Sequence, residues 1–409
     1  LYVALFPQLV AGPIVRYSTV EQEITLRSES LSQFSQGVVR FLFGLGKKML
    51  LANVMGEIAD AAFTTPPIWL SASHAWVGAV AYTFQIYFDF SAYSDMAIGL
   101  GRMFGFHFEE NFNYPYISKS VSEFWRRWHI SLSTWFRDYV YIPLGGSRCS
   151  RGRNIFNLAV VWLLTGFWHG ANWTFVLWGG WFLLLLLGEK FLWGKALERL
   201  PAPLRHVYTM LAVILSWVLF RAPDLTAASS YLAAMFGLGA GARDGQAVYL
   251  LLEYWPEWIA CVLAAMPLKG WLQDRLAGRE ALPAALAREW APKLAALALL
   301  LCVAVLFLTQ RLTALEGAAR GRSCLFALTL AGILLTGTGA RAIGGWLGVD
   351  FYIRMDPAEN HSLHGLTLSL WRDAFPQPKT PPEGYDRDYM LEVLERIDQL
   401  TESPDRPKE

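Results

Sequence analysis

The stretch Gly166-Phe-Trp-His-Gly-Ala-Asn-Trp173 lies inside an apolar run that extends from Ile155 to Leu187. A helix needs about 20 apolar residues to cross the hydrocarbon core of a bilayer, so a run of this kind is typical of membrane-embedded helices. The stretch places one imidazole, that of His169, near bilayer depth. A polar side chain is costly there, and it is therefore a candidate for function.

The rest of the chain is also strongly apolar. Hydrophobic residues make up 54% of the 409 residues and charged residues only 17%, which departs from soluble proteins in the direction of membrane proteins. The candidate membrane spans are residues 34–52, 75–104, 155–168, 173–187, 207–220, 247–266, 294–308 and 324–338. The formal net charge of +1 gives no electrostatic reason to expect a nucleic-acid partner. We expect an all-α, polytopic transmembrane helix bundle, with the lipid bilayer as its surroundings.

Charged residues interrupt several of these segments. Lys47 and Lys48 lie in the first, and Asp89 and Asp95 lie in the second. Interrupted segments are tolerated at membrane depth only where they are buried in protein or line a cavity, so we expect the bundle to enclose a tunnel. Asp95 and Arg102 fall on one helical face, seven residues apart, which predicts an ion pair between them.

A basic, amphipathic stretch precedes the opening motif. It contains Glu123-Phe-Trp-Arg-Arg-Trp-His-Ile-Ser-Leu-Ser-Thr-Trp-Phe-Arg-Asp-Tyr-Val-Tyr-Ile-Pro-Leu-Gly-Gly146, in which arginines are interleaved with aromatic residues. We predict a surface-lying or re-entrant helix that ends near Pro143, because proline cannot continue a helix. The positive-inside rule places such a basic cluster on the cytoplasmic side of the membrane.

The first candidate catalytic residue is His169. Gly166 and Gly170 flank it and permit either a close helix approach or a bend that opens space beside the ring. Asn172 and Trp173 follow at i+3 and i+4, so a continuous helix would place both on its face, where they could orient its tautomer. A buried neutral imidazole is a competent general base toward a hydroxyl. A packing role, in which the ring hydrogen-bonds a neighbouring helix, is the alternative that the residues leave open.

The second candidate is His129. Trp125, His129 and Ser133 are spaced at i, i+4 and i+8, which predicts that they line one face of a helix. On that face His129 could help to position an acyl donor at the cytoplasmic mouth of a cavity. The adjacent Arg126 and Arg127 would lower its pKa by like charge if they lie close to the ring. An interfacial histidine without a chemical role is the alternative.

The arginines of the basic stretch could bind phosphates through paired hydrogen bonds, as a coenzyme A headgroup requires. The candidates for donor binding are Arg126, Arg127, Arg137 and Arg148. Contact with anionic lipid headgroups is the alternative for each of them. The sequence gives no reason to expect a metal site or a bound cofactor.

Three further motifs complete the pattern: Phe6-Pro-Gln-Leu-Val-Ala-Gly-Pro-Ile-Val-Arg-Tyr17, Tyr87-Phe-Asp-Phe-Ser-Ala-Tyr-Ser-Asp-Met-Ala-Ile-Gly99 and Asn111-Phe-Asn-Tyr-Pro-Tyr116. With the two histidine motifs, the chain resembles the membrane-bound O-acyltransferases. It looks closest to the bacterial branch that holds the integral-membrane subunit of alginate O-acetylation and its relatives in peptidoglycan O-acetylation and teichoic-acid D-alanylation. The likeness is dense from residue 1 to about residue 187.

The resemblance implies a multi-pass bundle in the bacterial inner membrane, with His169 as the catalytic residue and His129 as a second functional histidine. It implies that an acyl group, most simply acetyl from acetyl-CoA, moves from a cytoplasmic donor across the membrane toward polysaccharide hydroxyls such as those of alginate. Periplasmic acetyltransferase partners would complete the transfer. Peptidoglycan O-acetylation and teichoic-acid D-alanylation stay open as alternatives within this class.

Two readings from other classes also stay open. The first is a transporter or flippase in which Asp89, Asp95 and His169 form a proton relay inside the membrane. Transporters often show a repeat that relates two halves, and none is evident in this sequence. The second is a scaffold that only assembles a periplasmic acetylation complex.

The composition divides the chain at residue 345. Residues 1–345 form the expected transmembrane acyltransferase core, and its natural N-terminus is expected to be missing, because the first residues read as the end of a hydrophobic segment already under way. Residues 346–409 form a charged, Pro-containing extramembrane tail. Within it, residues 387–400 place apolar side chains at helical spacing, which predicts one short amphipathic helix.

Overall fold

The computed structural model describes residue 2 and residues 12–27, 29–268 and 292–304. Every regular element in these ranges is helical, which confirms the all-α class. The predicted tail from residue 346, the candidate span at 324–338 and the second part of the candidate span at 294–308 lie outside the described residues. The division of the chain at residue 345 stays a prediction.

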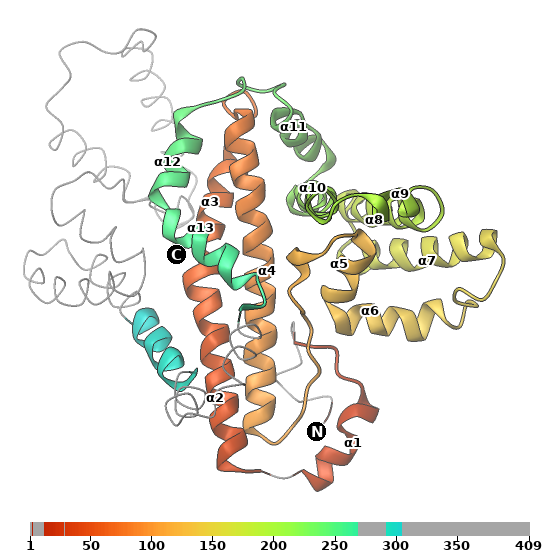
Figure 1. Ribbon diagram of the computed structural model, residues 1–409, viewed down its shortest axis with the longest axis vertical. Coiled ribbons are helices and arrows are strands. Elements are labelled where there is room, and N and C mark those ends of the chain that lie inside the picture. Colours follow the sequence, from red (N-terminus) through yellow and green to blue (C-terminus); the bar gives the residue numbers. More distant parts are fainter. Residues whose placement is uncertain (1, 3–11, 28, 269–291, 305–409) are drawn as a thin grey trace, which may run out of the picture. The chain divides into compact units, whose positions relative to one another are not determined.

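The helices follow one another through short connections (Figure 1). In chain order they are α1 (Tyr17–Leu26), α2 (Leu31–Gly46), the π-helical η3 (Lys47–Ala52), α3 (Asn53–Thr64), α4 (Ala72–Met103), the 3₁₀-helical η4 (Pro115–Ile117), α5 (Val121–Arg127), α6 (Ile130–Phe136), the π-helical η5 (Arg137–Tyr141), α7 (Arg151–His169), α8 (Trp173–Phe191), α9 (Gly194–Arg199), α10 (Ala202–Arg221), α11 (Leu225–Met235), α12 (Gly245–Glu253) and α13 (Trp255–Ala264). A further apolar helix spans Pro292–Ala304.

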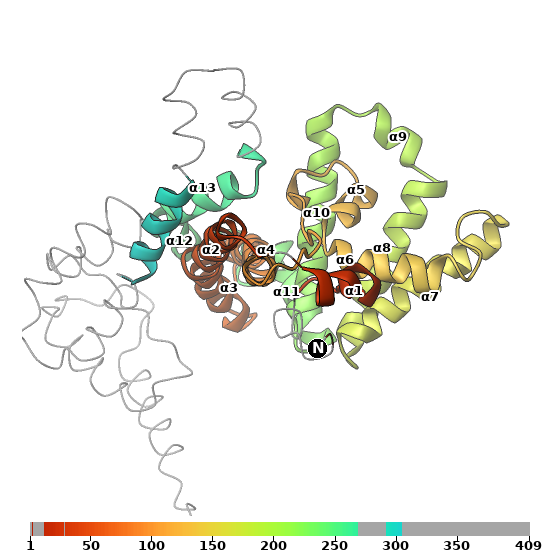
Figure 2. The same cartoon turned by 90° about the horizontal axis from the view of Figure 1, so that it is seen from below.

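The helices α2, η3 and α3 pack along the 32-residue helix α4 (Figures 1 and 2). Glycines allow the close contact: a Cβ on Gly37 would lie 2.6 Å from the carbonyl oxygen of Gly99, and one on Gly44 would lie 2.7 Å from that of Ala92. Small residues at helix crossings are typical of bundles in membranes, where close backbone packing replaces the hydrophobic effect as the source of association.

The charges inside this helix pair neutralise one another. Asp95 accepts hydrogen bonds from Arg40 at 2.7 Å and from Lys47 at 2.6 Å, and Lys48 pairs with Asp89. The predicted ion pair between Asp95 and Arg102 is therefore wrong, and Arg102 donates to a glutamine of α2 instead. Seven residues along one helix separate two side chains by about 10 Å of rise, whereas the neighbouring helix brings its cations directly against Asp95.

The helices α8 and α10 are each long and apolar enough to cross a membrane. Together, α12 and α13 are also long and apolar enough to cross a membrane, but the two helices are bent by 67° at their junction. Glu253 ends α12, and Pro256 and Glu257 lie in the first turn of α13, so two acidic residues and a proline stand at the bend. Among the described residues, the other helices of the candidate spans are too short or have too low a mean hydropathy to meet the same criterion.

An aromatic core joins α5, α8 and α10. Trp178, Trp217, Phe124 and Phe182 are all fully buried, and successive rings in this group lie about 5 to 6.5 Å apart. Large rings carry most of the burial in such a core and leave little room for rearrangement. This core supports the helix α5, which ends two residues before His129, and Trp178 of the core also contacts His169 at the end of α7.

Candidate functional site

The chain turns sharply directly after His169, which is the last residue of α7. Gly170 follows with φ 154° and ψ 163°, a conformation that residues with a side chain rarely adopt, and it ends the helix. Asn172 then caps α8 by accepting a hydrogen bond from the backbone N–H of Thr174 at 3.1 Å. The chain thus bends directly after the imidazole, which is one of the two arrangements that these glycines permit.

Aromatic rings surround the His169 imidazole. Its centroid lies 4.8 Å from that of Trp168, 5.0 Å from Trp178 and 5.1 Å from Phe220, in each case with the rings edge to face. Within the part of the chain that the structure describes, no hydrogen bond reaches the imidazole. Among the described residues, aromatic packing orients this ring, and neither of its nitrogens is taken by a hydrogen bond.

The two residues expected to support His169 lie elsewhere. Because α7 ends at His169, Asn172 and Trp173 do not share its helical face. Asn172 donates from Nδ2 to the carbonyl oxygen of Pro223 at 2.6 Å, and Trp173 is exposed. The geometric expectation for both residues is wrong, since it assumed a helix that continues through Gly170.

The helix predicted around His129 is broken in two. The helix α5 ends at Arg127, and His129 has φ 45° and ψ 56°, in the left-handed region, before α6 begins at Ile130. Trp125, His129 and Ser133 therefore do not line one continuous helical face, although the Ser133 hydroxyl donates to the Trp125 carbonyl oxygen at 3.4 Å. His129 itself is buried, and its Nδ1 lies 3.0 Å from Oδ1 of Asn111.

The rings of both histidines lie near the ring of Trp168. The centroid of the Trp168 ring lies 6.1 Å from that of His129 and 4.8 Å from that of His169. Burial, with a smaller contribution from the nearby His169, lowers the pKa of His129 to about 3, so its ring is neutral near pH 7. The expected cause, like charge from Arg126 and Arg127, does not contribute.

The arginines proposed for donor binding are exposed or paired with carboxylates. Arg126, Arg137 and Arg148 are exposed. Arg137 pairs with Asp138 at 2.7 Å, and Arg127 pairs with a glutamate of its own helix, with its charge thereby partly neutralised. A role for these arginines in binding a donor stays a prediction.

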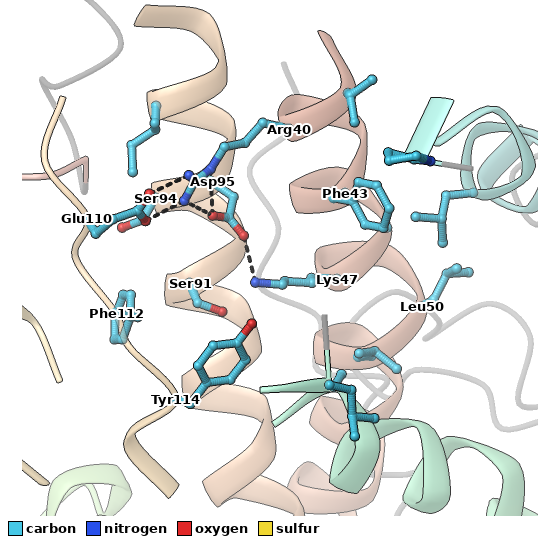
Figure 3. A pocket seen from close by; sticks show the side chains of 18 of the residues that line it. Arg40, Phe43, Lys47, Leu50, Ser91, Ser94, Asp95, Glu110, Phe112 and Tyr114 are labelled. Atoms are coloured by element: carbon cyan, nitrogen blue, oxygen red, sulfur yellow. Dashed lines mark hydrogen bonds and ion pairs between the residues drawn. The ribbon is translucent and has the colours of Figure 1, made fainter. Parts of the chain in front are cut away.

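A large cavity of about 1960 Å³ lies beside α2 and α4 (Figure 3). Arg40, Lys47, Asp95 and Glu110 form a charged cluster on its wall, as Figure 3 shows. The sequence signal for this cavity was the set of charges inside apolar segments, but Arg40 and Glu110 were not foreseen. The cavity is lined by Asn111 and Ile130, which are neighbours of His129, and not by His169.

A model of the membrane-bound O-acyltransferase family matches residues 1–230, which include both histidines and all of α10. The chain belongs to the membrane-bound O-acyltransferase family. The resemblance inferred from the motifs is thereby confirmed.

Similar members of the family act on surface polymers, according to their names. Over 238 residues, the chain is 50% identical to the probable alginate O-acetylase AlgI of Azotobacter vinelandii. The aligned region covers 58% of this chain and 47% of that relative. The chain is 40% identical over 247 residues to a peptidoglycan O-acetyltransferase of Helicobacter pylori, with 58% and 46% of the two chains covered.

A more distant member is the teichoic acid D-alanyltransferase of Streptococcus thermophilus, which is 32% identical over 196 residues and covers 44% of this chain and 46% of the relative. The chain thus spans about half the length of the curated relatives it matches.

Proposed function

We propose that this membrane-bound O-acyltransferase family member transfers an acetyl group from a cytoplasmic donor, acetyl-CoA, toward hydroxyl groups of an exopolysaccharide such as alginate. The transfer would take place at the bacterial inner membrane, with periplasmic acetyltransferase proteins as partners. The observation that carries the proposal is the imidazole of His169, which aromatic packing holds at a helix end and which has no hydrogen bond among the described residues. It stands in a chain that is 50% identical over 238 residues to a probable alginate O-acetylase.

The proposed chemistry uses His169 as a general base. As the acceptor oxygen attacks the thioester carbonyl, the proton of its hydroxyl passes to an imidazole nitrogen. A carbon–oxygen bond forms and the carbon–sulfur bond breaks, and the imidazolium then returns the proton to the leaving thiolate. An imidazole without hydrogen bonds among the described residues suits this role, because none of these residues must first release a nitrogen.

Three alternatives are less well supported. A proton relay through Asp89, Asp95 and His169, as a transporter would need, requires aspartates that are free to exchange protons. Both aspartates are held in ion pairs with cations of α2 and η3 instead. D-alanyl transfer and peptidoglycan acetylation are supported by relatives of lower identity, 32% and 40%.

Replacement of His169 tests the proposal. His169→Ala in the full chain, expressed in its membrane with its partners, should reduce the acetate released by base from the surface polymer about 10²- to 10⁴-fold, the usual contribution of a general base. His107→Ala is the matched control, since the His107 side chain is exposed and pairs with Glu23. His107 lies 62 residues before His169 in the chain. Acetylation at the unmodified level in His169→Ala, with normal protein in the membrane, would refute the catalytic assignment.

A second measurement addresses the donor and the acceptor. Membranes that contain the protein and its partners are supplied with labelled acetyl-CoA, and the label is followed into alginate and into peptidoglycan. Label in alginate that depends on His169 supports the proposal. Label in peptidoglycan alone would replace the acceptor, and no transfer from acetyl-CoA would replace the donor.

A further inference from the structure

Asn111 forms a hydrogen-bonding centre between α4 and the junction of α5 with α6. It is fully buried. Its Oδ1 accepts hydrogen bonds from the backbone N–H of Ser131 at 3.2 Å and from the Ser131 hydroxyl at 2.9 Å, and its Nδ2 donates to the Ser94 hydroxyl at 3.1 Å. Its backbone carbonyl oxygen accepts from the N–H of Ile130 at 2.9 Å. A buried side-chain amide whose oxygen and nitrogen are both in hydrogen bonds is a rigid element.

These bonds decide which way the amide faces. A backbone N–H can only donate, so the Asn111 atom next to the N–H of Ser131 is the oxygen and not the nitrogen. The same oxygen lies 3.0 Å from Nδ1 of His129. An amide oxygen cannot donate, so Nδ1 of His129 carries the proton in that contact. In the neutral imidazole the other nitrogen, Nε2, then has a free lone pair.

We propose that Asn111 is a positioning residue that holds His129 in the Nδ1–H tautomer and so presents Nε2 as a hydrogen-bond acceptor in the acyl-transfer site. The use of that acceptor rests on the proposed function, whereas the tautomer does not. Nε2 is suited to accept a hydrogen bond from the attacking hydroxyl or from an N–H group of the acyl donor. His129 shares Trp168 with the base His169, so the two rings serve one site.

The backbone around His129 supports the same assignment. A left-handed conformation in a residue other than glycine is costly and persists only where the surroundings impose it. Asn111 supplies that restraint, since it binds the two backbone N–H groups that directly follow His129, those of Ile130 and Ser131. Phe90 packs edge to face on the imidazole at 4.7 Å and limits its rotation. One residue therefore fixes both the position of the ring and its proton.

The ¹⁵N chemical shifts of the His129 ring test the tautomer directly, because they separate protonated from bare nitrogen. The protein is labelled in its histidine rings, placed in lipid nanodiscs, and His129 is assigned by loss of its signals in His129→Gln. We expect a protonated Nδ1 and a bare Nε2 at pH 7, and a mixture of tautomers in Asn111→Ala. A protonated Nε2 in the unmodified protein, or an unchanged Nδ1–H ring in Asn111→Ala, would overturn the proposal.

Kinetics with conservative variants separates positioning from folding. Asn111→Ala should lower kcat about 10- to 100-fold, the range typical when a residue that orients a functional imidazole is lost, with little change in donor KM. Asn111→Asp keeps an oxygen toward Nδ1 and should retain the Nδ1–H ring and recover most of kcat. Asn113→Ala, an exposed neighbour with only its backbone in use, is the matched control and should leave kcat unchanged.

The outcomes remain distinct from those of the proposed function. If Asn111→Ala does not fold, Asn111→Asp still decides, since a folded Asp variant with a protonated Nε2 contradicts the positioning role. If the unmodified protein shows the expected tautomer but transfers no acetyl group, the proposed function fails and the tautomer assignment stands. Equal kcat in Asn111→Ala and Asn113→Ala would refute the role in catalysis.

Discussion

The crossing of α7 and α8 at Gly166 offers a sharp test of how His169 is placed. A Cβ on Gly166 would lie 2.7 Å from the carbonyl oxygen of Phe175 and 3.2 Å from Cα of Val176, both backbone atoms of α8. Real Cβ atoms essentially never approach closer than 3.0 Å, so Gly166→Ala must separate the helices by at least about 0.3 Å. His169 lies one turn further along α7 and moves with it.

The expected cost follows from this geometry. Overpacking by one methyl group in a well-packed contact destabilises a protein by about 1–3 kcal/mol. A displacement of about 1 Å at a reacting group costs about 10²-fold in rate, so a shift of a few tenths of an ångström should lower the proposed acetyl transfer by a smaller factor. Gly166→Ala is thus expected to be folded, less stable and less active.

Gly180→Ala is the matched control. It lies in α8, and a Cβ there would meet no described atom within 4 Å. Because alanine favours a helix more than glycine by about 0.8–1 kcal/mol, this variant should be neutral or slightly stabilised. Thermal unfolding in detergent and acetyl transfer in membranes are measured for both variants. Equal stability and activity of the two variants would refute the claim that backbone contact at Gly166 positions His169.

Two further predictions concern charges. Asp95→Asn leaves Arg40 without one of its two carboxylate partners and Lys47 without its carboxylate, so it should destabilise the protein by about 1–3 kcal/mol. Arg102→Gln on the same helix is the control and should change stability by less than about 0.5 kcal/mol. Equal melting temperatures of the two variants would contradict this prediction. Hydrogen bonds from Arg137 and Arg16 lower the pKa of Asp138 from 3.8 to about 2. The stabilisation that the ionised Asp138 gives to the folded protein is therefore fully present above pH 3.8 and is lost as the pH falls through 2. The difference in melting temperature between the unmodified protein and Asp138→Asn should shrink only in that window, and a difference that shrinks near neutral pH would contradict this prediction.

The surroundings of His169 could be predicted from the sequence because the signals are local. Glycine permits close approach and unusual dihedral angles wherever it stands, so Gly166 and Gly170 pointed to a helix contact and a bend, and the structure has both. The aromatic rings around the imidazole could not be assigned, since Phe220 reaches it from α10, 51 residues later in the chain. Periodicity describes one helix and does not say which other helix packs against it.

The break at His129 could not be predicted for a related reason. Residues 123–136 contain neither glycine nor proline, so local propensity favours one continuous helix. Hydrogen bonds that His129, Ile130 and Ser131 donate to Asn111, which lies 18 residues before His129, override that preference. The same holds for Asp95, whose partners lie on α2 and η3. In each case a tertiary contact decided against a pattern that was sound within its own segment.

The two histidines are held by different means, and this difference divides their tasks in the proposed reaction. His169 has aromatic contacts and no hydrogen bond among the described residues, so its ring can gain a proton at either nitrogen and release it again. His129 has its Nδ1 bound to an amide oxygen that cannot receive a proton, so it cannot pass a proton from one nitrogen to the other. A residue fixed in this way suits the orientation of a substrate, whereas a free imidazole suits the transfer of a proton. The surroundings of the two rings thus favour His169 as the base and His129 as the group that aligns the reacting hydroxyl or the donor.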